Sequence, residues 1–309
     1  MLKRVLVTGG FGFIGQHTLA PLIERGYDVH VTTLQSHASS QEKITVHSID
    51  LLDCNKHLAL MKQIRPTHLL HTAWYTENGK FWDAVENVYW LKASISLAEA
   101  FYTEGGQRIL GLGTCAEYDW NEGVCVEGKT AENPSSLYGK VKKSAYECLN
   151  ALAQSKSRNL AWARIFFPYG PGEAKNRLIP YVIANLLQGN HANCTHGNQI
   201  RDFLHVSDMG HALAAVLDSE VTGAINIGSG SPVKIREIVT RIAQKLDGET
   251  LVKFGSIPEP PHSPAKILAN IDKLKNEVGW TPTLPLDEGL SSTISWWRNL
   301  EMMNLIRGE

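Results

Sequence analysis

A strand-length apolar run that leads directly into spaced glycines constrains the fold of this chain more than any other feature. Residues 3–8 read KRVLVT, residues 9–15 read GGFGFIG, and a segment with helical spacing follows as far as Gly26. Glycines between a strand and a helix permit a tight turn, in which backbone N–H groups can approach a pyrophosphate at the positive end of the helix. The stretch therefore predicts a dinucleotide-binding turn. The residues that we expect against the dinucleotide here are Gly9, Gly12, Phe13, Ile14 and Gly15.

Strand-like and helical segments alternate through residues 1–167. Further strand-like segments span 28–33, 44–49, 68–73, 107–113 and 160–167, and helical ones span about 80–104 and 136–155. This alternation predicts an α/β fold, a Rossmann-type doubly wound parallel sheet with helices on both faces. From residue 168 the elements become shorter, and we expect residues 168–309 to form mainly a smaller substrate-binding lobe, with some segments returning to the first domain.

Composition and charge exclude several classes of partner. The 309 residues are 43% hydrophobic and 20% charged, with a net charge of −1, so we expect no nucleic-acid partner. No apolar stretch reaches the roughly 18 residues that span a bilayer, and no signal peptide is recognisable, so we expect no membrane partner and a cytoplasmic protein. The five cysteines lack paired spacing, and we interpret residues 191–196 (HANCTH) as a polar loop rather than a metal site.

The ends of the second and third strands bear on the choice of cofactor. An acidic residue at the end of the second strand would bind the ribose hydroxyls of NAD, but that position holds Thr33. Because no carboxylate there repels a 2′-phosphate, the sequence favours NADP over NAD, although no Arg is present to bind that phosphate. Asp50, after the third strand, is expected to accept a hydrogen bond from the adenine amino group, and its alternative role is a helix N-cap.

Tyr138 and Lys142 lie four residues apart in a helical segment and therefore share one face. The ordinary pKa of tyrosine, about 10, is too high for easy proton exchange at neutral pH, and a nearby ammonium group lowers it. Tyr138 can then act as a general acid or base on an alcohol or ketone oxygen, while Lys142 also holds the nicotinamide ribose. Taken alone, such spacing more often marks an ordinary surface pair.

Several motifs occur together in an order that resembles the extended short-chain dehydrogenase/reductase family, which acts mainly on nucleotide sugars. TGGFGFIG at 8–15 and YGKVK at 138–142 are joined by HTAW at 71–74, which is similar to the family's His-Leu-Ala-Ala. RIFFPYGPG at 164–172 resembles its Arg-x-Phe-Asn-x-Tyr-Gly-Pro, and GNQIRDFLHVSD at 197–208 also follows in order. The resemblance implies a nucleotide-diphosphate sugar as substrate, NADP or NAD as cofactor, and a homodimer formed through the two long helices.

The resemblance also implies roles for individual residues. By position, Thr114 hydrogen-bonds the reacting oxygen, Tyr138 is the acid or base, and Lys142 is its partner. The further residues that it places against the cofactor, beside the glycine turn, are Thr33, Asp50, Leu51, Thr72, Ala73 and Asn87. The residues that it places against the substrate are Trp74, Thr114, Phe167, Arg177, Leu178 and Arg201. Phe167 departs from the family's Asn, and the Pro-rich segment 256–264 lacks an Arg that many relatives use on the diphosphate.

Cys115 and Ala116 narrow the reaction. Relatives that carry out 4,6-dehydration have Asp-Glu at these two positions, so we disfavour dehydration. A 3,5-epimerase/reductase has its Cys one place later, and we expect the Cys115 side chain to point to the other face of an extended strand. Two enzymatic readings stay open, a 4-ketoreductase acting on a 4-keto-6-deoxy sugar and a C4-epimerase with a transient ketone. NADP use favours the reductase, and Trp74 and Tyr75 would suit an apolar C6 methyl group. A non-catalytic dinucleotide sensor is the alternative from another class.

Overall fold

A parallel sheet forms the frame of the molecule, which a computed structural model describes over residues 3–34, 43–260 and 263–307. Within these residues the sheet contains seven strands, all paired in parallel. In spatial order they are β12 (Gly223–Ile227), β7 (Asn159–Ile165), β5 (Arg108–Thr114), β4 (His68–His71), β1 (Arg4–Thr8), β2 (Asp28–Thr33) and β3 (Ile44–Ser48). The strand order reverses between β1 and β4, the point in such sheets at which ligands bind beyond the carboxyl ends of the strands.

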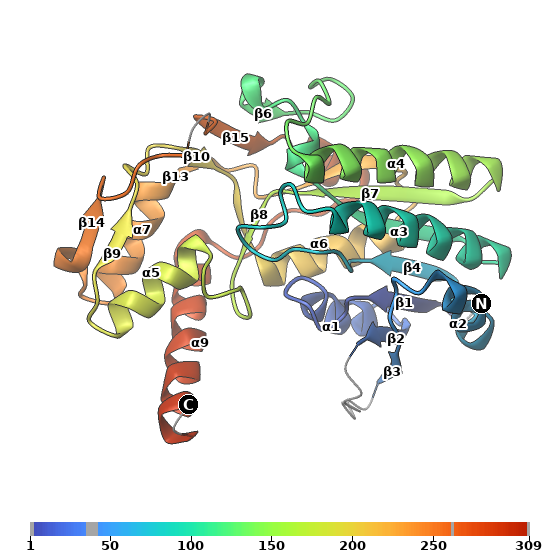
Figure 1. Cartoon of the computed structure of the whole chain (residues 1–309), viewed down its shortest axis with the longest axis horizontal. Helices are drawn as coiled ribbons and strands as arrows, with labels where there is room; N and C mark the ends of the chain where they lie inside the picture. Colours follow the sequence, from blue (N-terminus) through green and yellow to red (C-terminus); the bar gives the residue numbers. More distant parts are fainter. Residues whose placement is uncertain (1–2, 35–42, 261–262, 308–309) are drawn as a thin grey trace.

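Helices cover both faces of this sheet because its strands are apolar on both sides. Successive side chains of β1 point to opposite faces of the sheet, since Val5 and Val7 belong to one core cluster and Leu6 to another. On the face of Val5, α1 (Gln16–Glu24) packs against α6 (Val206–Asp218). The helices on the face of Leu6 are α2 (His57–Ile64), α3 (Glu86–Thr103) and α4 (Leu137–Ser155) (Figure 1). The prediction of a doubly wound α/β fold is confirmed.

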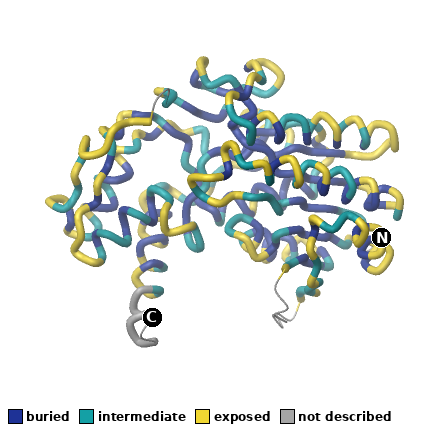
Figure 2. The backbone as a smooth tube through the Cα atoms, in the orientation of Figure 1, coloured by how far each residue is buried: buried dark blue, intermediate teal, exposed yellow. Residues whose placement is uncertain are grey.

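A third core cluster belongs to a lobe beside the sheet, at the left of Figure 1. Its main elements are α5 (Leu178–Leu187), α7 (Ile235–Lys245), α9 (Leu286–Arg307), β9 (Ala192–Cys194) and β14 (Val252–Phe254). Figure 2 shows the backbone of this lobe buried on its inner side and exposed outside. The short strands at the top and between the two parts are β6 (Val124–Cys125), β8 (Phe167–Tyr169), β10 (Ile200–Arg201), β11 (Phe203–His205), β13 (Val233–Lys234) and β15 (Lys266–Ala269). The short helix α8 (Asp272–Glu277) contacts β12 at the edge of the large sheet.

The later half of the chain contributes to both parts. β12 pairs with β7 at one edge of the large sheet, and α6 covers one of its faces, so segments after residue 168 also belong to the sheet and its covering helices. The interpretation of residues 191–196 as a polar loop was wrong, because Ala192–Cys194 forms β9 with Ala192 and Cys194 buried in the lobe's core. Part of the Pro-rich segment 256–264, residues 261–262, lies outside the described residues.

Candidate active site

The glycine turn has the geometry that a close ligand requires. Gly9 has a φ of 65°, and its carbonyl accepts a hydrogen bond from the Gly12 N–H at 2.9 Å. A Cβ on Gly15 would lie 2.2 Å from the Gly9 oxygen, so the chain can close here only without a side chain. A Cβ on Gly12 would have the Gly9 oxygen, 3.1 Å away, as its one neighbour within 4 Å among the described residues. The backbone of Gly12 therefore borders open space where α1 begins, which fits a pyrophosphate.

The end of β4 lies directly against this turn. The Thr72 hydroxyl donates to the Thr8 carbonyl at 2.6 Å, and a Cβ on Gly9 would lie 3.0 Å from the backbone of Ala73. The fold thus brings together the glycine turn, Thr72 and Ala73, three predicted cofactor contacts, at the point where the strand order reverses. Their contact with a cofactor stays a prediction.

The end of β2 and the segment that follows β3 hold three more of the predicted cofactor contacts. Thr33 is the last residue of β2. The Asp50 carboxylate accepts a hydrogen bond from the Leu52 N–H at 2.9 Å, and Leu51 is buried. The alternative role of Asp50 as a helix N-cap is wrong, because Asp53 caps the turn that follows, η1 (Cys54–Lys56).

Thr114 and Tyr138 meet beyond the carboxyl end of β5. The Thr114 side chain lies close enough to interact with the Tyr138 hydroxyl, and this interaction favours the phenolate. Burial has the larger effect and raises the pKa of Tyr138 above its ordinary value. The aromatic ring of Tyr138 is held edge to face by Phe81 and Trp82, at centroid distances of 4.9 and 5.9 Å. A hydroxyl pair of this kind can hydrogen-bond and exchange a proton with one ligand oxygen.

Lys142 lies one turn further along α4 and is buried. Its Nζ donates to the Leu112 carbonyl at 2.7 Å and lies 3.5 Å from the centroid of the Trp74 ring. Burial lowers the pKa of Lys142 to about 7, while the charge of Glu117 acts in the opposite direction. The expectation that Lys142 lowers the pKa of Tyr138 is wrong for this arrangement, because the ammonium faces Leu112 and Trp74 and the Tyr138 pKa is raised.

The turn after Thr114 differs from the predicted extended strand. β5 ends at Thr114, and Cys115–Glu117 forms a 3-10 turn, η2. Thr114 accepts a hydrogen bond from the Ala116 N–H at 3.2 Å through its side chain, and Glu117 accepts one from the Thr114 N–H at 2.9 Å. The expectation that Cys115 points to the other face of an extended strand was therefore wrong. The Cys115 thiol is buried, and burial raises its pKa.

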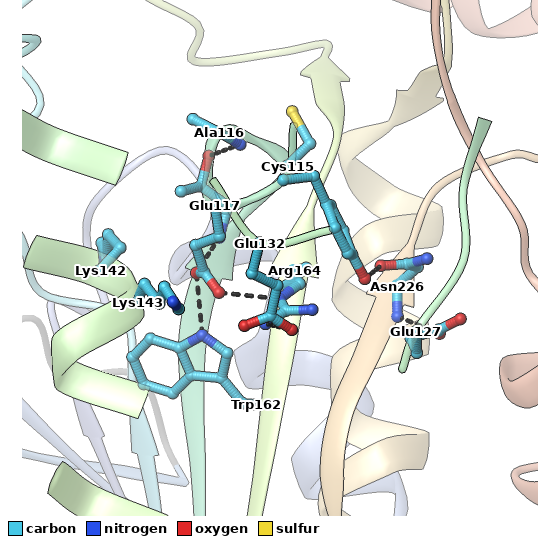
Figure 3. A network of polar contacts seen from close by, with 12 residues as sticks. Cys115, Ala116, Glu117, Glu127, Glu132, Lys142, Lys143, Trp162, Arg164 and Asn226 are labelled. Carbon is cyan, nitrogen blue, oxygen red and sulfur yellow. Dashed lines mark hydrogen bonds and ion pairs between the residues drawn. The ribbon is translucent and has the colours of Figure 1, made fainter. Parts of the chain in front are cut away.

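Glu117, which the sequence suggests only as a carboxyl in a turn, is fully buried at the centre of a polar network (Figure 3). Its carboxylate accepts hydrogen bonds from Trp162 Nε1 at 2.9 Å and from Arg164 Nε at 2.8 Å. Arg164 also forms an ion pair of 2.6 Å with Glu132. Glu117 was not among the predicted site residues, although Thr114-x-x-Glu117 has the spacing of a capping box, which the structure contains. The ring of Tyr118, the next residue, is buried as well.

The predicted substrate residues fall into two groups. In the first, Trp74 lies against Lys142, and Arg177, immediately before α5, lies 5.4 Å from the ring of Phe81, which packs on Tyr138. Leu178 is the first residue of α5. In the second group, the guanidinium of Arg201 lies 5.6 Å from the ring of Phe167. Because β8 and β11 pair, Phe167 and Phe203 also lie in contact, with centroids 5.8 Å apart.

Asn87 occupies a different setting from the one expected of a cofactor ligand. It is fully buried, its side-chain oxygen accepts from Trp74 Nε1 at 2.8 Å, and its amide donates to the Phe81 and Ala84 carbonyls. In this structure Asn87 therefore fixes Trp74 and the start of α3, and a direct contact with a cofactor stays a prediction.

The described residues hold neither a cluster of metal-binding side chains nor a membrane-spanning helix. No three or more His, Cys, Asp or Glu side chains of the described chain come together as metal ligands would. Among the helices that the structure describes, none combines the length and apolar character needed to cross a membrane.

Comparisons with known proteins agree on one family. The model of the NAD dependent epimerase/dehydratase family matches residues 5–228. The chain is 27% identical to dTDP-D-glucose 4,6-dehydratase of Mus musculus over 96% of its length and 89% of the relative's. It is 26% identical to UDP-glucose 4-epimerase of Bacillus subtilis, covering 94% and 96%, and 24% identical to dTDP-4-dehydro-6-deoxyglucose reductase of Escherichia coli, also covering 94% and 96%. Among solved structures, MoeE5 in complex with UDP-glucuronic acid and NAD is 27% identical, with a TM-score of 0.84 and coverage of 96% and 99%.

Proposed function

This chain belongs to the NAD dependent epimerase/dehydratase family, and on that premise we propose that it reduces a nucleotide-diphosphate 4-keto-6-deoxy sugar at C4. The observation that carries the proposal is the interaction between the Thr114 and Tyr138 side chains beyond the carboxyl end of β5, with Lys142 on the same helix as Tyr138. A pair of hydroxyl groups in this position can hold and protonate the oxygen of a ketone. Such a pair has no evident use in a protein that only senses a dinucleotide.

The chain's own residues would bind the substrate oxygen and move its proton. Thr114 donates a hydrogen bond to the ketone oxygen, and Tyr138 delivers the proton as this oxygen becomes an alcohol. Lys142 Nζ lies 6.0 Å from the centroid of the Tyr138 ring, and its positive charge would favour the phenolate that remains. Phe81 and Trp82 hold the Tyr138 ring and limit the access of water to its hydroxyl. When bound, the dinucleotide supplies the hydride.

The glycine turn, Thr72 and Ala73 would hold the dinucleotide. The tight Gly9–Gly12 turn and the space beside Gly12 fit its pyrophosphate, and the start of α1 favours the negative charge. The family is NAD-dependent, and MoeE5 binds NAD. NADP use by this chain is a finer proposal that rests on Thr33, which leaves the end of β2 without the carboxylate that would repel a 2′-phosphate.

The two residues after Thr114 argue against a dehydratase, because neither has an acidic side chain. The positions of the expected acid pair hold Cys115 and Ala116, both buried, and burial keeps the Cys115 thiol protonated at neutral pH. Neither side chain can remove a proton from C5 and donate one to the C6 hydroxyl. The burial of Cys115 likewise argues against its use as the acid of a 3,5-epimerase.

A C4-epimerase is the second candidate, and one observation removes part of the case for the reductase. Trp74 was expected to line the sugar site and suit an apolar C6 methyl group, but its indole contacts Lys142 and Asn87 instead. That reason for a 6-deoxy sugar is therefore weakened. An epimerase would use the same hydroxyl pair, with the sugar turning over in the site as a ketone before the hydride returns.

The assembly and compartment are also proposals. Val85, beside α3, and Val88 and Tyr89 on α3 are exposed, which supports a homodimer formed through α3 and α4. A cytoplasmic location remains a prediction from the sequence. For the nucleotide, Arg201 and Phe167 are the proposed contacts, and Arg177 is the proposed contact for the diphosphate.

The experiment combines a substrate panel with one variant. Purified protein is incubated with nucleotide sugars and their 4-keto-6-deoxy forms, while NAD(P)H absorbance and sugar products are followed. Stoichiometric oxidation of NAD(P)H is expected of the reductase, whereas isomerisation without net consumption would identify the epimerase. In Tyr138→Phe we expect turnover to fall by about 100-fold or more, with dinucleotide binding retained, because only the proton-transferring hydroxyl is removed. Turnover at the wild-type rate would refute the proposed mechanism.

A further inference from the structure

The Lys142 ammonium has an unusual set of neighbours. Only 4% of the residue is exposed, and its Nζ lies over the face of the Trp74 indole, 3.5 Å from the ring centroid. The rings of Trp162 and Tyr138 are further away, at 5.9 and 6.0 Å. Trp74 is therefore the nearest of these aromatic rings, at a distance where the electron-rich face of the indole attracts a cation strongly.

Trp74 itself is held in place by a second buried residue. Its Nε1 donates to Asn87 Oδ1 at 2.8 Å, and Asn87 Nδ2 donates to the Phe81 carbonyl at 2.7 Å and the Ala84 carbonyl at 2.9 Å. Asn87 is fully buried and belongs to α3. A continuous set of contacts thus runs from the start of α3 through the Asn87 amide and the Trp74 indole to the ammonium group.

We propose that Trp74 is a positioning residue that keeps Lys142 in its charged form and directs it toward the Leu112 carbonyl, and that Asn87 acts through Trp74. The consequence for catalysis rests on the proposed function, in which Lys142 must carry a charge to stabilise the Tyr138 phenolate. The family's His-Leu-Ala-Ala stretch has Ala where this chain has Trp74, so the device belongs to this sequence.

The charged and titratable groups around Lys142 give its ammonium form little support, which leaves the contact with the Trp74 ring a substantial role in stabilising that form. Among the described residues, Glu117 on η2 is the group whose charge favours the ammonium form. His71 on β4 also faces Lys142, but burial lowers the pKa of His71 to about 3, so this imidazole is neutral at working pH. Tyr138, on the same helix, has a raised pKa and is neutral as well. Burial brings the pKa of Lys142 to about 7, where a modest change in its surroundings alters its charge.

The direct test measures the titration of Lys142 in the protein without cofactor. The ¹³Cε resonance of Lys142, assigned by its loss in Lys142→Arg, is followed from pH 5 to 10 in wild type, Trp74→Phe and Trp74→Leu. Trp74→Leu should lower the pKa of Lys142 by about one unit, and Trp74→Phe by less, since phenylalanine keeps a weaker aromatic face. Trp90→Phe is the matched control, because Trp90 stacks on Trp74 with ring centroids 6.3 Å apart, whereas the aromatic contacts of the Lys142 ammonium are with Trp74, Trp162 and Tyr138.

Asn87→Ala tests the second step. This variant should move the pKa of Lys142 in the same direction, and the effect should disappear in the Trp74→Leu background, since Asn87 acts through the indole. If Asn87→Ala shifts the pKa of Lys142 equally in the wild-type and Trp74→Leu backgrounds, the proposal that Asn87 acts through Trp74 is refuted. An unchanged Lys142 pKa in both Trp74 variants would overturn the proposal as a whole. Because Trp74→Phe retains an aromatic ring, it keeps the test open if Trp74→Leu fails to fold.

The pH dependence of turnover separates this proposal from the proposed function. If charged Lys142 is needed, kcat/KM falls as pH rises through the pKa of Lys142, and in Trp74→Phe this fall begins at lower pH. A shifted titration with an unshifted kcat/KM profile would refute the catalytic consequence while leaving the contact itself intact. Full activity of Tyr138→Phe would refute the proposed function without changing the titration of Lys142.

Discussion

Replacement of Arg164 by Met tests whether the network below the candidate site carries much of its stability. Arg164 is fully buried and pairs with Glu117 at 2.8 Å, and Glu117 is equally buried. Methionine fills a similar volume but leaves the Glu117 carboxylate with two neutral donors, the Thr114 N–H and Trp162 Nε1. Removing one partner of a buried pair typically costs about 3–5 kcal/mol, because the other charge stays buried without compensation. We expect Arg164→Met to lose an amount in this range.

The loss should also depend on pH. Burial raises the pKa of Glu117, and Arg164 opposes this effect in the wild type. Without Arg164, the Glu117 carboxyl binds a proton more tightly in the folded state than in the unfolded state. Between the two pKa values the unfolded state therefore holds fewer protons than the folded state. The free energy of unfolding of Arg164→Met should therefore fall with rising pH, from the ordinary pKa of Glu up to the raised one, by at most about 1.4 kcal/mol per pH unit.

The double variant Glu117→Gln/Arg164→Met is the control for this reasoning. It removes both buried charges, so it should be more stable than Arg164→Met alone, even though it carries one more substitution. Urea unfolding followed by far-UV circular dichroism at pH 5.5 and 8 gives the free energies. A loss below about 1 kcal/mol in Arg164→Met, or a double variant less stable than the single one, would refute an ionised, structurally important pair.

Two further predictions concern packing and protonation. Gly139→Ala should lower both Tm and kcat. The new Cβ would lie 2.3 Å from the Ala116 carbonyl oxygen and would force α4, with Tyr138, away from Thr114. A Tm within about one degree of the wild-type value would contradict this contact. His71→Asn should flatten the acid side of the stability profile: folded His71 titrates at about 3 and unfolded His at about 6.5, so the unfolded state binds more protons between these values and wild-type stability falls as pH falls. Urea unfolding at pH 7 and 5 measures the difference, and parallel pH profiles of the two proteins would speak against a neutral, buried imidazole.

The parts of the fold that the sequence predicts are those that local pattern determines. β2 spans Asp28–Thr33, as the alternation of its residues predicts, and β5 and α4 agree to within one residue. The glycine turn is equally local, since the spacing of Gly9, Gly12 and Gly15 already implies where side chains cannot fit. Position along the chain then brings the turn and the end of β4 together, because parallel strands end at one edge.

The orientation of side chains in the site depends instead on contacts between distant segments. Nothing in the spacing of Tyr138 and Lys142 indicates that Trp74, more than sixty residues earlier, binds the ammonium and turns it toward Leu112. Asn87 is a nearer case, because the three partners of its amide, Trp74, Phe81 and Ala84, lie within 13 residues of it along the chain. Burial is the largest influence on the pKa values of Tyr138 and Lys142. It depends on how the folded chain packs, and the local sequence indicates it only weakly.

Glu117 joins the local and the distant contributions. Glu117 is the fourth residue of Thr114-x-x-Glu117 and completes the capping box at the start of η2, which orients Thr114. The spacing of these two residues in the sequence already indicates this role. Through Arg164, Glu117 ties the same turn to β7, and its charge favours the ammonium form of Lys142. One buried carboxylate thus sets the direction of the hydroxyl that meets Tyr138 and the charge of the lysine behind it. A substitution at Glu117 should therefore alter geometry and protonation together, whereas one at Trp74 should alter mainly protonation, and the two can be told apart by comparing the Lys142 titration with the stability of each variant.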